Sequence, residues 1–327
     1  MTSKYNLDPK LFEEFNKMSM EASEIFLGSK IVERFDIPTS LEFIRNHVNK
    51  NLPLVIRNAL TETPAFKKWN SKYLRKLIPE KEVNVAITPN GYADGIARNS
   101  KDGKEYFVMP EEASMTMSDF LDALDDKNGP VHYIQRQNSN LTEDFPELVD
   151  DLDYSLINFA KEAFDKEPDA VNFWMGDSRA VSSMHKDPYE NIYCVISGFK
   201  DFILIPPVDV HLIPRLTYQS AIYETDDNNV MRIKPLFDDC QKPIMIDWVS
   251  IDPLNPDLKK YPHYEKANVY RVRINAGDIL YLPTLWYHHV QQSHKCIAVN
   301  YWFDMEYDSR YCLFKMMERL CGYQVDE

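Results

Sequence analysis

Residues 185–206 read HKDPYENIYCVISGFKDFILIP, and this stretch decides the fold. Two runs of β-branched, aromatic and apolar residues, Ile192–Ser197 and Asp201–Ile205, are separated by the turn dipeptide Ser197-Gly198. This pattern predicts two consecutive strands joined as a hairpin. The tripeptide His185-Lys186-Asp187 lies just ahead of the first strand, and Lys200 opens the second.

Similar short runs follow one another through the second half of the chain, from about Tyr133 onward. Turn signals such as Ala276-Gly277-Asp278 and Pro283-Thr284 separate them. Many short strands with closely spaced turns predict an antiparallel sandwich or barrel. The further strands that we expect are His132–Gln135, Val171–Met175, Val269–Ile274, Ile279–Leu282 and Ile297–Phe303.

Helical patterns flank this β-rich half. Asp8-Pro9 is typical of a helix start, Gly28 of a helix end, and Thr39 with Glu42 has the spacing of a capping box. We therefore expect a mainly β fold of three parts. These are N-terminal helices and strands in residues 1–130 that pack on the barrel, a β core in 131–308, and a C-terminal helix in 309–327. A proline-rich stretch at about 213–264 is expected to be an insertion in the core, not a domain.

Composition excludes several classes of protein. The 327 residues include 37 Lys+Arg and 51 Asp+Glu, which gives a net charge of −14. This balance argues against direct nucleic-acid binding and favours a basic protein or peptide as partner. No apolar run approaches the roughly 20 residues that span a bilayer, and the first residues lack a signal-peptide pattern. Five cysteines without CxxC spacing favour a reducing compartment, which means cytoplasm or nucleus.

The tripeptide His185-Lys186-Asp187 is a candidate metal motif. In an extended backbone His185 and Asp187 point to the same face, because strand side chains alternate with period two. An imidazole and a carboxylate on one face can reach the same cation. A second histidine would complete a two-histidine, one-carboxylate site with open positions, which is typical of non-haem Fe(II) oxygenases. A surface turn can also contain such a tripeptide, so the second histidine decides the interpretation.

Several histidines could supply that ligand. His288 and His289 follow the predicted strand Ile279–Leu282 and the turn Pro283-Thr284. Alternation lets only one of two adjacent side chains face inward. These residues alone leave the choice open among His211, His263, His288, His289 and His294.

Lys200 is a second candidate functional residue. It begins an apolar strand next to the metal motif, where a lysine must either extend its ammonium to water or pair with an anion. A buried lysine here would therefore suit an anionic cosubstrate.

Taken together, the motifs resemble the jumonji-C (JmjC) oxygenases over the core from about Tyr133 to Asp308. The segments 56–60, 88–94, 169–174 and 300–308 further resemble JmjC-only lysyl hydroxylases, which extends the similarity to most of the chain. The motifs that carry the resemblance are His185-Lys186-Asp187, Ser197-Gly198-Phe199-Lys200, the run Gly277–Pro283, His288-His289 and Asn300-Tyr301-Trp302.

The resemblance implies a double-stranded β-helix, a cupin-like jelly roll, that uses Fe(II), 2-oxoglutarate and O₂. By motif position His185, Asp187 and His288, the first of the histidine pair, would be the metal ligands. Lys200 would pair with the distal carboxylate of 2-oxoglutarate, and the hydroxyl of Ser182 would bond the same carboxylate. Most relatives carry threonine at the position of Ser182. The resemblance assigns the cosubstrate pocket to Tyr133, Ser182, Asn191, Tyr193, Lys200 and Asn300.

The activity that the resemblance implies is C-hydroxylation of a peptidyl lysine, at the 3-position. Its implied substrates are conserved GTPases of the developmentally regulated GTP-binding type. The acidic charge suits a lysine-bearing substrate, and we expect Asp94 and Glu190 to face the target ammonium.

Three alternatives compete with hydroxylation. Demethylation of histone Nε-methyl-lysine uses the same iron chemistry, but no chromatin-reader domain or zinc-binding Cys/His cluster accompanies the core. A metal-dependent peptidase acting on histone tails would lack the HExxH motif of zincins. A non-catalytic cupin-like binding module would leave the metal and cosubstrate residues without a purpose.

The terminal helix suggests self-association. Its apolar residues cover more of its circumference than one core-facing stripe requires. Related JmjC hydroxylases dimerise through such helices, so we expect a homodimer.

Overall fold

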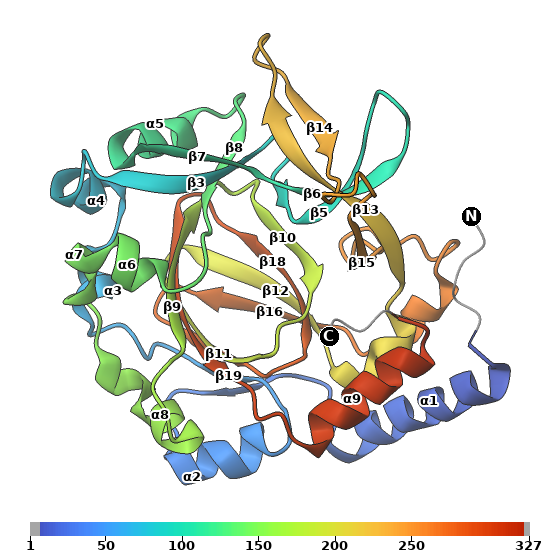
Figure 1. Cartoon of the computed structure of the whole chain (residues 1–327). Coiled ribbons are helices and arrows are strands. Elements are labelled where there is room, and N and C mark those ends of the chain that lie inside the picture. The colour runs from blue at the N-terminus through green and yellow to red at the C-terminus, as the bar shows by residue number, and fades with distance from the viewer. Residues whose placement is uncertain (1–6, 324–327) are drawn as a thin grey trace.

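The computed structural model describes residues 7–323, and two facing β-sheets form its centre (Figure 1). The larger sheet contains β1 (Val32–Arg34), β2 (Leu54–Ile56), β3 (Glu82–Thr88), β7 (Glu111–Thr116), β8 (Val131–Ile134), β9 (Ala170–Gly176), β11 (Tyr189–Ser197), β17 (Ile279–Leu282) and β19 (Cys296–Asp304). The smaller sheet contains β4 (Tyr92–Ala93), β10 (Val181–His185), β12 (Phe199–Ile205), β16 (Tyr270–Asn275) and β18 (Tyr287–Gln292). The prediction of a mainly β, jelly-roll core is confirmed.

The strand orders show how the N-terminal part joins the core. They are β1-β2-β17-β11-β19-β9-β8-β3-β7 in the larger sheet and β16-β12-β18-β10-β4 in the smaller. Strands from the first 130 residues therefore extend the larger sheet at both ends and do not merely pack against it.

The prediction of a hairpin at Ser197-Gly198 is wrong in one respect. Both strands exist, but β11 pairs with β17 and β19, whereas β12 pairs with β16 and β18. Gly198, at φ 78°, therefore carries the chain from one sheet to the other. The physical reason is that Tyr193 and Val195 of β11 pack against Phe202 and Leu204 of β12 in the core between the sheets.

The outer face of the larger sheet is covered by short helices (Figure 1). Phe43 packs edge-on against Tyr281 of β17, with ring centroids 4.7 Å apart, and against Phe159 at 4.9 Å. The capping box predicted at Thr39 and Glu42 begins the first of these helices. They are α2 (Ser40–Phe43), η2 (Ile44–Val48), α3 (Pro64–Lys68), α4 (Ser71–Leu77), α5 (Met117–Asp125), α6 (Asn140–Asp144), α7 (Pro146–Val149), η3 (Tyr154–Ile157) and α8 (Asn158–Phe164).

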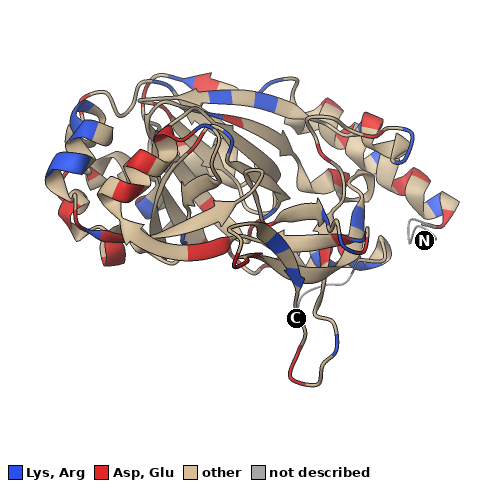
Figure 2. Cartoon of the chain, turned by 90° about the horizontal axis from the view of Figure 1, so that it is seen from above, with Lys and Arg blue, Asp and Glu red and all other residues tan. Residues whose placement is uncertain are grey.

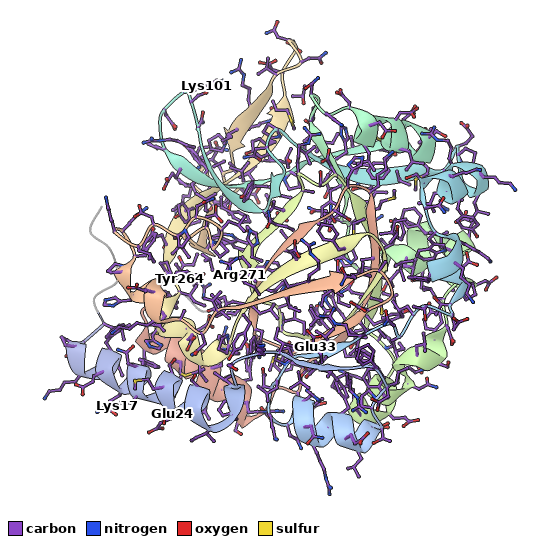
Figure 3. The ribbon with its side chains drawn as sticks, turned by 180° about the vertical axis from the view of Figure 1, so that it is seen from behind. Lys17, Glu24, Glu33, Lys101, Tyr264 and Arg271 are labelled. Carbon is purple, nitrogen blue, oxygen red and sulfur yellow. The ribbon has the colours of Figure 1, made fainter. Side chains whose placement is uncertain are left out.

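Two longer helices, α1 (Pro9–Ala22) and α9 (Ser309–Leu320), lie side by side against the rest of the barrel (Figure 1). Asp8 caps α1 as predicted, and the π-helix η1 (Ser23–Leu27) prolongs it to Gly28. Phe15 of α1 and Phe314 of α9 share a core with residues of the smaller sheet and with the helical turns η4 (Pro207–Leu212) and η5 (Pro262–Lys266). The polar side of the N-terminal helix, with Lys17 and Glu24, faces outward (Figure 3).

The insertion expected at about 213–264 forms strands. Its strands β13 (Arg215–Thr225), β14 (Met231–Pro235) and β15 (Met245–Val249) build a third sheet with β5 (Gly95–Arg98) and β6 (Glu105–Met109). β13 pairs in parallel with β6. Local patterns did not reveal this sheet, because the pairing joins segments that are far apart in the sequence.

The surface is charged and the centre is not. Lys, Arg, Asp and Glu lie mostly on outer helices, loops and strand edges, while the central strands carry few (Figure 2). Within residues 7–323, none of the helices has the length and apolar character needed to span a membrane.

A buried ion cluster ties α9 to the metal-motif strand. Glu318 is only 1% exposed. It accepts a hydrogen bond from Arg215 Nη1 at 2.7 Å, and Lys186 Nζ lies 3.4 Å from the same oxygen. The Lys186 ammonium also lies 5.2 Å from the centre of the Phe314 ring. Lys186 therefore turns away from its neighbours His185 and Asp187 and anchors the strand end to the C-terminal helix.

Replacing Glu318 tests this anchor. Glu318→Ala leaves the half-buried cations Arg215 and Lys186 without their carboxylate, so we expect the free energy of unfolding to fall by about 3 kcal/mol. Chemical denaturation measures the change. Glu306→Ala, at an exposed position, is the control and should stay within about 0.5 kcal/mol of the parent. A loss below about 1 kcal/mol in Glu318→Ala would contradict the anchor.

Candidate metal and cosubstrate site

Two histidines face each other across neighbouring strands. His185 ends β10 and is the register partner of His288 in β18. Their ring centroids are 4.2 Å apart. The Nδ1 atoms lie 2.7 Å from the carbonyl oxygen of Ser183 and 3.0 Å from that of Trp286. A backbone carbonyl at Nδ1 fixes the tautomer with its proton there, so both Nε2 lone pairs are free to bind a metal.

Asp187 completes the cluster from a loop. It lies between β10 and β11, so alternation along one strand does not place it. Its Oδ2 atom is 3.7 Å from His185 Nε2 and 3.6 Å from His288 Nε2. Leu285 N donates to the Asp187 carbonyl at 2.9 Å and ties this loop to the turn before β18. One ligand atom from each residue lies within 4.8 Å of the others.

The donor set fits Fe(II). Two imidazole nitrogens and one carboxylate oxygen on a single side of the cavity make the facial arrangement that leaves coordination positions open. Burial, together with the nearby His185, lowers the pKa of His288 to about 4. The imidazole of His288 is therefore neutral at pH 7, as a metal ligand must be.

The other candidate histidines lie elsewhere. His289 is buried on the opposite face of β18 from His288, and neither of its ring nitrogens has a partner among the described residues. His211 stacks on Phe15, and His263 lies against Phe12. His294 Nε2 is 3.9 Å from Asp125 near the surface. Of the five candidates, only His288 approaches His185 and Asp187.

A cavity of about 320 Å³ opens on the three residues. Lys200 lies in its wall and is 1% exposed. Its Nζ donates to the Tyr133 hydroxyl at 2.9 Å and to Gln292 Oε1 at 2.8 Å. Within residues 7–323 no carboxylate forms an ion pair with this ammonium. Burial lowers the pKa of Lys200 to about 8.

A dicarboxylate cosubstrate fits this environment. A buried ammonium with only neutral partners is costly, and an anion in the cavity offsets that cost. The structure brings all six residues expected for 2-oxoglutarate to one cavity, namely Tyr133, Ser182, Asn191, Tyr193, Lys200 and Asn300. Asn300 links its own strand, β19, to β11 and β9. Its Nδ2 donates to Asn191 Oδ1 at 3.1 Å, and its Oδ1 accepts from Trp174 Nε1 at 2.8 Å.

Sequence reasoning missed Gln292, although a signal for it existed. Gln292 is the register partner of Lys200 and lies two and four residues beyond Val290 and His288, so period two puts all three on one face. Gly176 makes room for this arrangement. A Cβ atom there would lie 2.4 Å from the Tyr133 ring and 2.8 Å from Gln292 Nε2.

The third sheet supplies a wall that the sequence did not reveal. Trp248 of β15 stacks against His185 with an interplanar angle of 11° and ring centroids 6.2 Å apart. Phe107 of β6 packs on Trp248 at 4.5 Å. Both residues line the cavity, so the insertion forms part of the site.

The two expected substrate residues have different surroundings. Asp94 lines the cavity, and burial raises the pKa of its carboxyl group. Glu190 does not line it, and that expectation is wrong. Its carboxylate accepts from the Tyr281 hydroxyl at 2.7 Å and from Thr284 N at 3.2 Å. Glu190 precedes Asn191 on β11, so alternation turns it to the other face of the larger sheet.

Comparison with known proteins agrees with this geometry. The family model described as "Cupin-like domain" matches residues 39–309. The human bifunctional peptidase and (3S)-lysyl hydroxylase JMJD7 is 44% identical over 285 residues, which are 86% of this chain and 87% of the human protein. JmjC domain-containing protein E of Dictyostelium discoideum is 37% identical, over 95% of this chain and 94% of its own.

A plant relative is similar over almost the whole chain as well. Lysine-specific demethylase JMJ32 of Arabidopsis thaliana is 34% identical over 94% of this chain and 91% of its own length. The family model spans the segments that carry His185, Asp187 and His288. The chain therefore belongs to the cupin-like JmjC-domain family of 2-oxoglutarate oxygenases.

Proposed function

We propose that this protein is an Fe(II)- and 2-oxoglutarate-dependent peptidyl-lysine C-hydroxylase that modifies the 3-position. The observation that carries the proposal is the shared cavity of the His185, Asp187 and His288 cluster and the buried Lys200. The choice of lysyl hydroxylation rests on the 44% identity to the human (3S)-lysyl hydroxylase. As its substrates we propose GTPases of the developmentally regulated GTP-binding type, and the net charge of −14 suits a basic target.

Each part of the cavity has its own task in this reaction. His185, Asp187 and His288 would hold the metal, while Lys200, Tyr133 and Ser182 would hold the distal carboxylate of 2-oxoglutarate. When bound, Fe(II) and 2-oxoglutarate supply the activation of O₂ that hydroxylation of an unactivated C–H bond requires.

The remaining walls orient the reactants and exclude water. Trp174, Phe202 and Leu282 form apolar walls, and water that such walls exclude on substrate binding no longer weakens the charge interactions inside the cavity. The Asn300–Asn191 and Trp174–Asn300 hydrogen bonds hold β11, β19 and β9 in fixed relation. The protein thereby keeps the cosubstrate and the target carbon in one geometry, which is the main contribution of a binding site to such a reaction.

Lysine demethylation is the second candidate, favoured by the similarity to the Arabidopsis demethylase. The same metal and cosubstrate residues would serve it. Mass spectrometry of the peptide product distinguishes the two reactions. Gain of one oxygen on unmodified lysine supports hydroxylation, whereas loss of a methyl group from methyl-lysine supports demethylation.

The metal cluster yields a direct test of the proposed reaction. We expect Asp187→Ala and His288→Ala to lower the hydroxylation of a lysine peptide at least about 100-fold, because each removes one of three ligands. His294→Ala is the matched control, since this histidine lies outside the cavity. Near-parental hydroxylation by His288→Ala would contradict the assignment, and absence of any oxygen gain with the parent protein would contradict lysyl hydroxylation.

Lys200 gives a second prediction through the pH dependence of cosubstrate binding. The ammonium has a pKa of about 8 in the free protein, and the anion binds its protonated form. The dissociation constant of 2-oxoglutarate should therefore rise above about pH 8, by up to about tenfold per pH unit. Lys200→Met should weaken binding by about 10- to 100-fold at pH 7 and abolish this rise.

Titration calorimetry with Mn(II) in place of Fe(II) measures the binding without turnover. Lys295→Met is the control, because this lysine pairs with Asp125 outside the cavity. Equal pH profiles in the parent and in Lys200→Met would show that another group governs binding.

We also propose a homodimer through α9. Leu313, Met316 and Leu320 are 55%, 44% and 46% exposed, while Phe314 and Glu318 face the barrel. A second copy of the chain would cover the exposed side of α9 without disturbing the side that packs on the barrel.

Charged residues introduced on the exposed side of α9 test the proposed homodimer. Leu313→Glu with Met316→Glu should convert a dimer into a monomer, because two carboxylates in an apolar interface lose their hydration. Light scattering measures the mass. The control is Glu306→Lys. Lys315→Glu would not serve, because Lys315 lies close to the anchoring residue Glu318. A dimer that persists in the double variant would exclude α9 as the interface.

A further inference from the structure

A second cavity adjoins the cosubstrate cavity. Its volume is about 340 Å³, and Asp94, Gln135 and Gln137 line both cavities. Its other walls come from the third sheet and from the end of the larger sheet, including Asn84 of β3 and Glu112 of β7. A bound polypeptide could therefore lie in the second cavity and reach the metal cluster past these three shared residues.

The Asp94 carboxylate stands at that junction, within electrostatic reach of His185. Within residues 7–323 it takes part in no hydrogen bond and no ion pair, although the residue is half-buried. The neighbouring Arg136 does not neutralise it, because Arg136 Nη1 is bonded to Asp144 at 3.2 Å. Glu112 adds negative charge to the same region. A half-buried, unpaired carboxylate is the group that a substrate cation stabilises.

Asp94 is also held in fixed relation to the metal cluster. Its carbonyl oxygen accepts from Ser183 Oγ at 2.6 Å, and Ser183 Oγ in turn accepts from Trp248 Nε1 at 3.0 Å. Trp248 stacks on His185. The backbone of Asp94 has φ 54°, a left-handed conformation that aspartate and asparagine tolerate better than most residues.

The second cavity offers groups that suit a peptide backbone. Gln135, Gln137 and Asn138 follow β8 directly, and their side-chain amides make no hydrogen bonds within the part of the chain that the structure describes. Each amide provides both a donor and an acceptor. Such groups can pair with the N–H and C=O groups of an extended polypeptide, whatever its side chains are.

We propose that the second cavity receives an extended stretch of the protein substrate and that Asp94, at its junction with the cosubstrate cavity, pairs with the ammonium of the target lysine. This inference rests on the proposed lysyl hydroxylation and adds a specificity-determining residue and a peptide subsite to it. Asp94 selects a cationic side chain, while Gln135, Gln137 and Asn138 bind backbone without regard to sequence.

Two peptides and two variants test the role of Asp94. The peptides carry either lysine or norleucine, its uncharged analogue, at one central position. Fluorescence anisotropy measures their binding to the full chain loaded with Mn(II) and 2-oxoglutarate. Asp94→Asn keeps the size and the backbone preference of the residue, and Asp227→Asn makes the same change at an exposed position outside both cavities.

The parent and Asp227→Asn should bind the lysine peptide at least about tenfold more tightly than the norleucine peptide. Asp94→Asn should bind both peptides equally. Discrimination that survives in Asp94→Asn, while the parent hydroxylates the lysine peptide, would overturn this inference and leave the proposed function intact. Failure of the parent to hydroxylate lysine would overturn the proposed function itself.

Gln137→Ala tests the peptide subsite separately. It should weaken binding of both peptides by the same factor, about three- to tenfold, because it removes backbone contacts and no charge. Unchanged binding of both peptides would show that the polypeptide does not occupy the second cavity.

Discussion

A pair of imidazoles on neighbouring strands is the constraint on which the rest of this molecule depends. His185 and His288 reach one point only because β10 and β18 are antiparallel neighbours in a register that places them opposite each other. Backbone carbonyls of Ser183 and Trp286 then turn both Nε2 atoms toward Asp187. A shift of one residue in either strand would reverse the side chains and destroy the cluster.

The rest of the fold maintains that register. The larger sheet packs its inner face on the smaller one, while helices such as α2 and α8 cover its outer face. On the other side, Lys186 turns away from the cluster and pairs with Glu318 of α9. The metal-motif segment is thus fixed on both faces, with ligands directed to the cavity and the intervening lysine directed to the C-terminal helix.

The cavity separates two kinds of charge. Lys200 lies inside one wall as an ammonium without an anion, and Asp94 lies at the opening as a carboxylate without a cation. Lys200 is buried and Asp94 is half-buried, and unpaired charge is costly where water is partly excluded. An anionic cosubstrate at Lys200 and a cationic side chain at Asp94 would satisfy both, which joins the chemistry of the family to a preference for lysine.

The sequence alone determined the strand-rich core, the helix caps at Asp8 and Thr39, and the motif His185-Lys186-Asp187, because these depend on local patterns. Residue patterns left five histidines open and motif position assigned His288, which the tertiary structure places opposite His185. Only the tertiary structure separated β11 from β12 and turned Glu190 away from the cavity. It also brought Trp248 and Phe107 to the site through a sheet whose strands are distant in the chain. Those outcomes depend on strand pairing and register, which link residues that no local pattern connects.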